Sequence, residues 1–309
     1  MTVAYLFPGQ GSQAVGMGKA LFERSAEARE LFGRADEVLG FPLSKLCFEG
    51  PEEELRLTRN TQPALLVVST AACRELGRDP AVAAGHSLGE YSALVAAGSL
   101  RFEDAVLLVH KRGRYMQEAV PVGVGAMAAV LGVPGEEIER RLGDVRAGVV
   151  EIANWNSDDQ IVISGEKAAV EQALAAIRAP RSVVLPVSAP FHSRLMKPAE
   201  ERLAADLDAA DFADPRFPIV TNVDARLIRT GEEARDALKR QVSRAVLWTK
   251  SMGVLKDLAV DAYVECGPGK VLAGLLKRIG RTWPKPPVLH NVEDGEGAER
   301  ARAALFGLL

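Results

Sequence analysis

The sequence lacks the features by which membrane proteins and nucleic-acid-binding proteins are recognised. No apolar run approaches the roughly 20 residues that a membrane-spanning helix needs. The first residues have neither the charged leader nor the long apolar core of a signal peptide. A net charge of −3 leaves no general basic surface for nucleic acid. We therefore expect a cytoplasmic protein that binds neither nucleic acid nor membranes.

Cysteine and histidine are both scarce in this chain. The three cysteines, Cys47, Cys73 and Cys266, lie far apart in apolar surroundings, which argues against a metal cluster or a disulfide framework. We expect them to be buried thiols in a reducing compartment. The small number of histidines leaves few candidates for a catalytic base. The four histidines are His86, His110, His192 and His290.

The composition is that of a globular protein, because 48% of the 309 residues are hydrophobic and 26% are charged. The length fits one large domain or two unequal ones. The first 123 residues alternate between strand and helix patterns, which is typical of a mostly parallel sheet covered by helices. The expected elements are strands at 3–7 and 81–84 and helices at 17–39, 62–76, 88–97 and 102–119.

The pattern changes between residues 124 and 195, where strand, helix, strand, strand, helix and strand follow one another. This order is that of the ferredoxin-like unit. A turn-rich stretch at 154–159 separates its second strand (149–153) from its third (160–164). We predict a large α/β domain of residues 1–123 and 196–309, interrupted by a small ferredoxin-like domain of residues 124–195. The remaining expected elements are strands at 126–131, 182–187, 217–221 and 262–266 and helices at 134–142, 167–178, 198–207, 232–242 and 271–279.

Ser87 stands in the sequence Gly85-His86-Ser87-Leu88-Gly89, between a predicted strand and a predicted helix. G-x-S-x-G in that context is the nucleophile-elbow pattern. The turn is so sharp that the serine takes an unfavourable backbone conformation, and the two glycines remove side chains that would collide. The N–H of Leu88 then points at whatever the serine attacks. The pattern predicts acyl chemistry, with a chance match in a glycine-rich chain as the alternative.

A serine nucleophile needs a general base within hydrogen-bond reach. His86 adjoins the serine, but in an elbow its side chain should point elsewhere. We favour His192, because its irregular loop lies at the predicted domain junction, where ligand pockets concentrate; a structural loop histidine is the alternative. A base histidine also needs an orienting partner. Asp224 is the nearest acidic candidate, and a backbone carbonyl is the alternative.

Arg112 falls on an apolar stripe of the helix predicted at 102–119. Ala105, Val109 and Met116 share this stripe, with Leu108 beside it. A guanidinium that faces a core must be paired, since an unpaired buried charge costs several kcal/mol or more. Its partner is either an internal Asp or Glu, which the residue pattern alone favours, or a substrate carboxylate gripped by two hydrogen bonds.

A glycine-containing loop at 7–13 follows the first strand, at the sheet edge where open α/β folds bind ligands. Its amides are placed to donate to a developing oxyanion. The loop does not match G-x-G-x-x-G. The Gly267–Lys270 segment lacks both the spacing of a P-loop and its following Ser or Thr. We therefore expect no bound nucleotide cofactor and no metal.

Seven segments together resemble one family, in its order and spacing, from about residue 3 to 280. The family is the malonyl-CoA:acyl carrier protein transacylases of bacterial fatty acid synthesis. The resemblance implies an α/β-hydrolase-like large domain with a ferredoxin-like small one. The segments are FPGQGSQ at 7–13, TQPA at 61–64, GHSLGEYSAL at 85–94, RGRYMQ at 112–117, PFHS at 190–193, NVD at 222–224 and ECGPGKVL at 265–272.

The resemblance implies a role for each matching catalytic position. Ser87 would be the nucleophile, carrying malonate as an ester, and His192 would be its base. Gln241 would orient that histidine through its backbone carbonyl, which would explain the missing acid. Gln10 and the N–H of Leu88 would form the oxyanion hole.

The resemblance also implies how the acyl group is chosen. Arg112 would hold the malonyl carboxylate, which reverses the preference for an internal acid. Phe191 precedes the histidine; in related polyketide acyltransferases, phenylalanine there accompanies malonyl and serine accompanies methylmalonyl preference. His86 and Gln62 are further expected to line the substrate site.

The activity implied is ping-pong transfer of malonyl from malonyl-CoA to acyl carrier protein, whose own phosphopantetheine supplies the thiol. We expect a free-standing chain; its oligomeric state cannot be read from the sequence, which is compatible with a monomer. A basic face of Lys270, Lys277, Arg278 and Arg281 is a candidate contact for an acidic carrier protein, with a solvated helix face as the alternative. The other functions that we weigh are a polyketide acyltransferase, a serine hydrolase or thioesterase, and a silent docking module.

Overall fold

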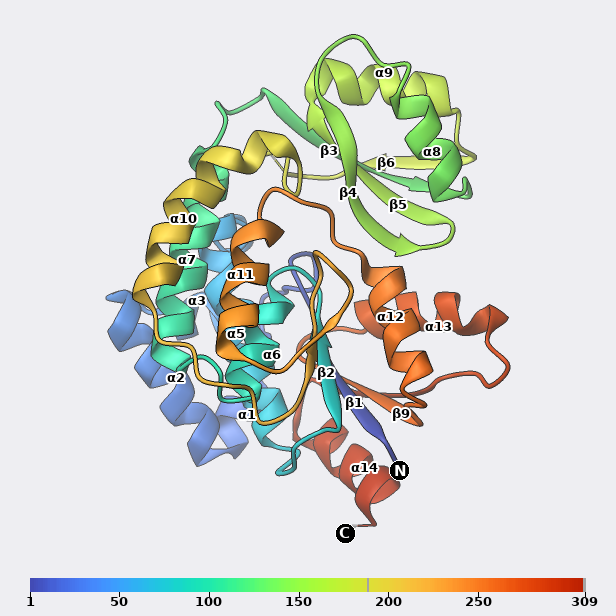
Figure 1. Cartoon of the computed structure of the whole chain (residues 1–309). Coiled ribbons are helices and arrows are strands. Elements are labelled where there is room, and N and C mark those ends of the chain that lie inside the picture. Colours follow the sequence, from blue (N-terminus) through green and yellow to red (C-terminus); the bar gives the residue numbers. More distant parts are fainter. Residues whose placement is uncertain (188, 308–309) are drawn as a thin grey trace.

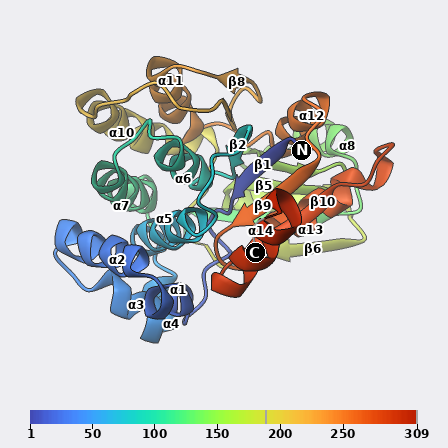
Figure 2. The same cartoon turned by 90° about the horizontal axis from the view of Figure 1, so that it is seen from below.

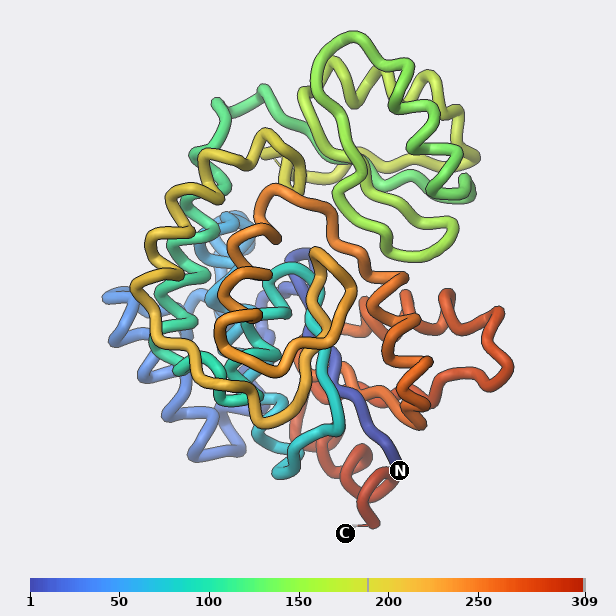
Figure 3. Tube along the Cα trace, viewed as in Figure 1, coloured from blue at the N-terminus to red at the C-terminus, as the bar shows by residue number. Residues whose placement is uncertain are grey.

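A computed structural model describes residues 1–187 and 189–307 and places a large sheet and a small sheet within them (Figure 1). Ser188, which belongs to the loop predicted before His192, lies outside the described residues. The chain leaves the main body to form the small sheet and then returns to it (Figure 3). The predicted α/β class is confirmed, whereas the domain boundaries after residues 123 and 195 stay a prediction.

The main sheet is mostly parallel, and only its last pair, β7 with β8, is antiparallel among the described strands. Its central strands are buried along their whole length, as expected for a sheet covered on both faces. The order is β10 (Val288–Val292), β9 (Ala262–Cys266), β1 (Val3–Phe7), β2 (Val82–Gly85), β7 (Ile219–Val220) and β8 (Leu227–Ile228).

Helices cover both faces of the main sheet (Figure 2). The helices of the main body, some of which pack on other helices, are α1 (Lys19–Arg24), α2 (Ala26–Leu39), α3 (Leu43–Glu49), α4 (Glu52–Leu55), α5 (Thr58–Arg74), α6 (Gly89–Ala96), α7 (Phe102–Glu118), α10 (Lys197–Ala209), α11 (Gly231–Gln241), α12 (Trp248–Asp257), α13 (Val271–Ile279) and α14 (Gly295–Phe306).

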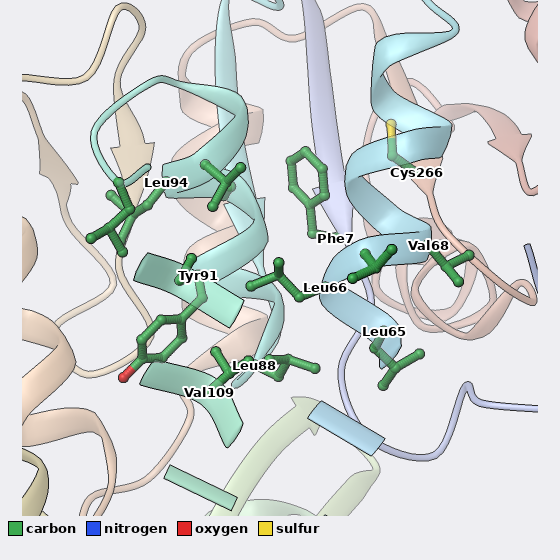
Figure 4. Close-up of a cluster of buried hydrophobic side chains, with 14 of the residues drawn as sticks. Phe7, Leu65, Leu66, Val68, Leu88, Tyr91, Leu94, Val109 and Cys266 are labelled. Atoms are coloured by element: carbon green, nitrogen blue, oxygen red, sulfur yellow. The ribbon is translucent and has the colours of Figure 1, made fainter. Parts of the chain in front are cut away.

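Successive side chains of β1 point to opposite faces of the main sheet. Tyr5 and Phe7 join a large hydrophobic cluster with α2, α5, α6 and α7, part of which Figure 4 shows. Leu6 packs on the other face with side chains of α12 and α13. The core is therefore divided by the sheet, and its strands hold the loops at their carboxyl ends in fixed positions.

The small sheet is antiparallel, in the order β4 (Val150–Ser157), β5 (Gln160–Glu166), β3 (Gly125–Leu131) and β6 (Arg181–Val184). Helices α8 (Gly135–Leu142) and α9 (Lys167–Ile177) pack against it, as the predicted ferredoxin-like unit requires. The backbone of β4 also pairs with the main body. Trp155 N–H donates to the Val246 carbonyl at 2.9 Å, and Val246 N–H donates to the Ala153 carbonyl at 2.8 Å.

Three expectations about local structure are wrong. The stretch at 154–159 is mostly strand, because β-bulges at Ile152/Asn154 and Trp155/Ser157 keep this polar segment paired with β5. The helix expected at 17–39 is two helices, since the Ser25 hydroxyl accepts from Ala28 N–H at 3.3 Å and begins α2 there. Strand β6 ends at Val184, not at residue 187.

Several elements were not predicted at all. They are α3, α4, α12, α14, β8 and β10. Cys47 and Cys266 are buried as expected, but Cys73 is only partly buried; all three are free thiols. Within the described ranges, no helix combines the length and the apolar character that crossing a membrane requires.

Candidate active site

The turn between β2 and α6 has the geometry of a nucleophile elbow. Ser87 has a φ of 52°, in the left-handed region that side chains rarely adopt. A Cβ at Gly85 would collide with the backbone of Gly89, and a Cβ at Gly89 would collide with the carbonyl of Phe7. Both glycines are therefore required for the close approach that turns the chain and exposes the serine.

Asn222 stabilises this strained turn from the loop after β7. Its side-chain oxygen accepts from Ser87 N–H at 2.6 Å, and its side-chain nitrogen donates to the Gly85 carbonyl at 2.6 Å. The sequence singled out Asn222 only as part of a matching segment. Its contribution depends on β7 pairing with β2, which no local pattern reveals.

His192 lies against Ser87 as a base should. Its Nε2 is 2.7 Å from Ser87 Oγ, and its Nδ1 is 3.0 Å from the Gln241 carbonyl and 3.2 Å from the Arg244 carbonyl. Because carbonyl oxygens only accept, Nδ1 must carry the proton, and Nε2 is left free to accept from the serine hydroxyl. Like Ser87, His192 has a positive φ, 57°, so both residues of the pair sit in strained backbone.

Of the two orienting partners left open for the histidine, the structure shows backbone carbonyls and not Asp224. Asp224 instead accepts from Arg240 at 2.8 and 2.6 Å. Backbone carbonyls take the place of an acid, as the family resemblance implied for Gln241; that of Arg244 was not foreseen.

The electrostatic environment keeps the histidine neutral. Burial, followed by the nearby Arg112 cation, lowers the pKa of His192 to about 3. The imidazole is therefore unprotonated at neutral pH and able to accept a proton from the serine.

Arg112 is buried, with 1% of its surface exposed, and its guanidinium points toward the serine. It donates to Gln62 Oε1 at 2.9 Å, to Gln241 Oε1 at 2.9 Å and to Ser87 Oγ at 3.1 Å. Its Nε has no partner in the parts of the chain that the structure describes. No carboxylate of the described residues forms an ion pair with it, so an internal acid as its direct partner is wrong. The arrangement leaves a buried cation without a contacting anion from the described residues, and an anionic ligand beside Ser87 would supply one.

A small cavity between the main sheet and the small sheet brings the predicted site residues together. Gln241 lies behind the cavity wall and reaches it through its bonds to Arg112 and His192. The lining residues that were not predicted as site residues are Met116, Met127, Asn154, Leu185 and Val187. The predicted residues that line the cavity are Gln10, Gln62, His86, Ser87, Leu88, Arg112, Phe191 and His192.

The two groups proposed for the oxyanion hole open into the same cavity as the serine. Gln10 Nε2 donates only a long hydrogen bond, to Thr58 Oγ1 at 3.3 Å. The N–H of Leu88 has no hydrogen-bond partner among residues 1–187 and 189–307. Both donors are thus available to an oxyanion, and their role stays a prediction.

The other histidines are held away from Ser87 Oγ. His86 Nε2 is 2.9 Å from Asn156 Oδ1, and its ring packs against Trp248 with centroids 5.4 Å apart. His110 Nδ1 bonds the Arg59 carbonyl at 2.9 Å, and His290 belongs to β10. In the described residues, no group of His, Cys, Asp and Glu has the arrangement of a metal site.

Known proteins share this sequence and fold over almost their whole length. Residues 4–292 match the family described as acyl transferase domain. The chain is 48% identical over 287 residues to the malonyl CoA-acyl carrier protein transacylase of Bacillus subtilis (strain 168), covering 90% of each protein.

Solved structures agree with this assignment. The malonyl CoA-acyl carrier protein transacylase from Coxiella burnetii superimposes with a TM-score of 0.94 and 41% identity, over 97% of this chain and 96% of that one. A malonyl-transacylase in complex with its type II PKS acyl-carrier protein gives a TM-score of 0.94 and 43% identity, over 97% and 99%. The resemblance inferred from the seven segments is confirmed: the chain belongs to the malonyl CoA-acyl carrier protein transacylase family of acyl transferases.

Proposed function

We propose that the chain transfers the malonyl group of malonyl-CoA to the phosphopantetheine thiol of an acyl carrier protein, through an ester on Ser87. The observation that carries the proposal is the buried Arg112 guanidinium, 3.1 Å from the nucleophilic oxygen and without a carboxylate partner among the described residues. A hydrolase for neutral acyl groups has no use for such a cation. An acyl group that ends in a carboxylate supplies the missing anion at the right distance from the serine.

The first half-reaction forms the malonyl ester. Ser87 Oγ attacks the thioester carbonyl carbon while His192 Nε2 takes its proton. The tetrahedral oxyanion accepts from Gln10 and from the N–H of Leu88. The carbon–sulfur bond then breaks, the proton passes from His192 to the departing CoA sulfur, and the malonyl carboxylate stays on Arg112.

The second half-reaction runs the same steps with a different thiol. The phosphopantetheine sulfur attacks the ester carbon while His192 takes the thiol proton. The oxyanion forms in the same place, the bond to Ser87 Oγ breaks, and His192 returns the proton to that oxygen. The acyl group exchanges an ester for a thioester, so transfer must outpace hydrolysis, which the small volume of the cavity favours.

The same proposal covers the setting of the reaction. The chain works without a bound cofactor of its own, in the cytoplasm, and supplies malonyl groups for fatty acid chain elongation. The partners are malonyl-CoA and an acyl carrier protein. The basic residues around Lys270 and Arg278 remain the candidate contact for the acidic carrier.

Labelling with radioactive malonyl-CoA tests the proposal. We expect one malonyl group per wild-type chain, chased onto carrier protein but not onto water, and no label on Ser87→Ala. Ser92→Ala is the matched control, because Ser92 is a serine of the elbow helix that is buried, unlike Ser87, and its hydroxyl has no partner in the described part of the chain. Label retained on Ser87→Ala, or release of free malonate faster than transfer, contradicts the proposal.

A further inference from the structure

Glu90 is a buried carboxylate that the proposed mechanism does not use. It lies in the first turn of α6, three residues after Ser87, with 1% of its surface exposed. One of its oxygens, Oε2, accepts from Asn222 N–H at 2.9 Å and from Gln241 Nε2 at 2.8 Å. The other oxygen has no partner within the described residues. A carboxylate that is half unsatisfied in the core is costly, so its presence calls for a function.

Glu90 determines which way the side-chain amide of Gln241 faces. The amide nitrogen of Gln241 is close to two groups that can only accept, Glu90 Oε2 at 2.8 Å and the Ser87 carbonyl at 3.0 Å. An amide has its donors on nitrogen and its acceptor on oxygen. The nitrogen must therefore face Glu90 and Ser87, and the amide oxygen is left to accept from Arg112 Nη2 at 2.9 Å.

This chain of bonds gives Arg112 a fixed hydrogen-bond acceptor without a direct ion pair. A carboxylate in contact with the guanidinium would satisfy the cation and compete with any anionic ligand. Here Glu90 acts through Gln241 as a hydrogen-bond acceptor, and because burial raises the pKa of Glu90 to about 7, this role does not depend on a full negative charge. Arg112 is held in place, and no protein carboxylate of the described residues occupies the side of the guanidinium that faces Ser87.

We propose that Glu90 is a positioning residue for the choice of acyl group: through Gln241 it holds Arg112 aimed at Ser87, so that the site selects acyl groups that end in a carboxylate. The inference rests on the proposed function. It assigns selectivity to a residue that does not touch the substrate.

A second branch of the same network has a different expected effect. Through the N–H of Asn222, Glu90 also supports the residue that clamps the Ser87 backbone. That branch serves every acyl group equally. The ratio of kcat/KM for malonyl-CoA over acetyl-CoA therefore isolates the branch through Gln241, because a general loss of active-site order cancels in the ratio.

The test compares this ratio in wild type, Glu90→Met, Glu90→Gln and the control Ser92→Ala. Methionine has a similar length but no strong acceptor, so the Gln241 amide becomes free to turn and Arg112 loses a fixed acceptor. We expect the ratio to fall about tenfold or more in Glu90→Met, as for loss of a hydrogen bond to a charged group. Glu90→Gln keeps an acceptor oxygen and should recover part of the ratio, and Ser92→Ala should keep all of it.

Gln241→Met is a second, independent test of the same link, and it still tests the inference if Glu90→Met does not fold. It removes the amide but leaves the backbone carbonyl that orients His192, and the ratio should again fall about tenfold. In the double variant the ratio should fall no further than in either single variant, because both changes break one link.

An unchanged ratio of kcat/KM for malonyl-CoA over acetyl-CoA in Glu90→Met or in Gln241→Met overturns the inference. The inference is also overturned if the ratio in the double variant falls by the product of the two single effects. Absence of malonyl label on wild-type Ser87 would instead contradict the proposed function.

Discussion

Replacing Arg112 by methionine should convert a malonyl-selective site into one that prefers neutral acyl groups. Methionine fills a similar volume on the apolar stripe of α7 and removes only the guanidinium. The acetyl group makes no demand on that cation, whereas a malonyl carboxylate loses both of its expected hydrogen bonds and enters a buried site without a counter-charge.

The structure sets the size of the effect. Truncating one partner of a buried, hydrogen-bonded charge pair costs about 2–5 kcal/mol, which is roughly 30-fold to several thousand-fold in kcat/KM for malonyl-CoA. For acetyl-CoA no contact to the acyl group is lost, but Ser87 Oγ loses its 3.1 Å hydrogen bond from Arg112, and Gln62 and Gln241 lose theirs, as they do with malonyl-CoA. A hydrogen bond that involves a charged group contributes about 1.5–3 kcal/mol, or roughly 10-fold to 150-fold in rate. The same loss applies to malonyl-CoA, so it cancels in the malonyl-to-acetyl ratio, which should still fall by the roughly 30-fold or more that the carboxylate contact contributes.

The assay is single-turnover acylation of Ser87 with each thioester, which reports chemistry before product release. Arg114→Met is the matched control, since Arg114 lies two residues further along α7 and is exposed; it should alter neither rate. If Arg112→Met keeps the malonyl-to-acetyl ratio of wild type, the assignment of this guanidinium to the substrate carboxylate is refuted.

Two further predictions concern the base and the elbow. Burial and Arg112 lower the pKa of His192 to about 3. The neutral base is lost only as pH falls through that value, so kcat/KM should persist well below pH 6. A midpoint in the ordinary histidine range near 6.5 would contradict this. Gly85→Ala should destabilise the protein by about 1–3 kcal/mol and slow acylation, because its Cβ meets the Gly89 backbone. The control Gly274→Ala lies in the interior of α13, where a Cβ would meet no neighbouring element among the described residues, and should stabilise the protein by about 0.5–1 kcal/mol. Thermal unfolding measures the stability of both variants. Equal shifts in the two variants would refute the steric argument.

Local patterns were enough to predict the parts of the site that depend on neighbouring residues. The elbow requires only Gly85, Ser87 and Gly89 between a strand and a helix, and that geometry is present. The helical period placed Arg112 in the core, where it is buried. The roles of these residues in catalysis remain predictions, because the geometry brings them together without showing a reaction.

Contacts between distant segments were beyond the reach of the sequence. Nothing near Arg112 indicates that Gln62 and Gln241, from two other helices, accept its hydrogen bonds. The residues alone left Asp224 and a backbone carbonyl as alternatives for orienting His192, because a main-chain carbonyl has no signature in a sequence, and only the family resemblance indicated Gln241. The polar stretch at 154–159 looked like a turn, since its pairing depends on bulges that only the partner strand β5 reveals.

The dual use of Gln241 has a consequence for how this protein can change. Its main chain orients the base, and every residue type has that carbonyl, so a point mutation at this position does not delete it. Its side chain reaches Arg112, and that part is exchangeable. Laboratory evolution can therefore substitute position 241 to change which acyl donors are accepted. Each such variant keeps the main-chain carbonyl that orients His192.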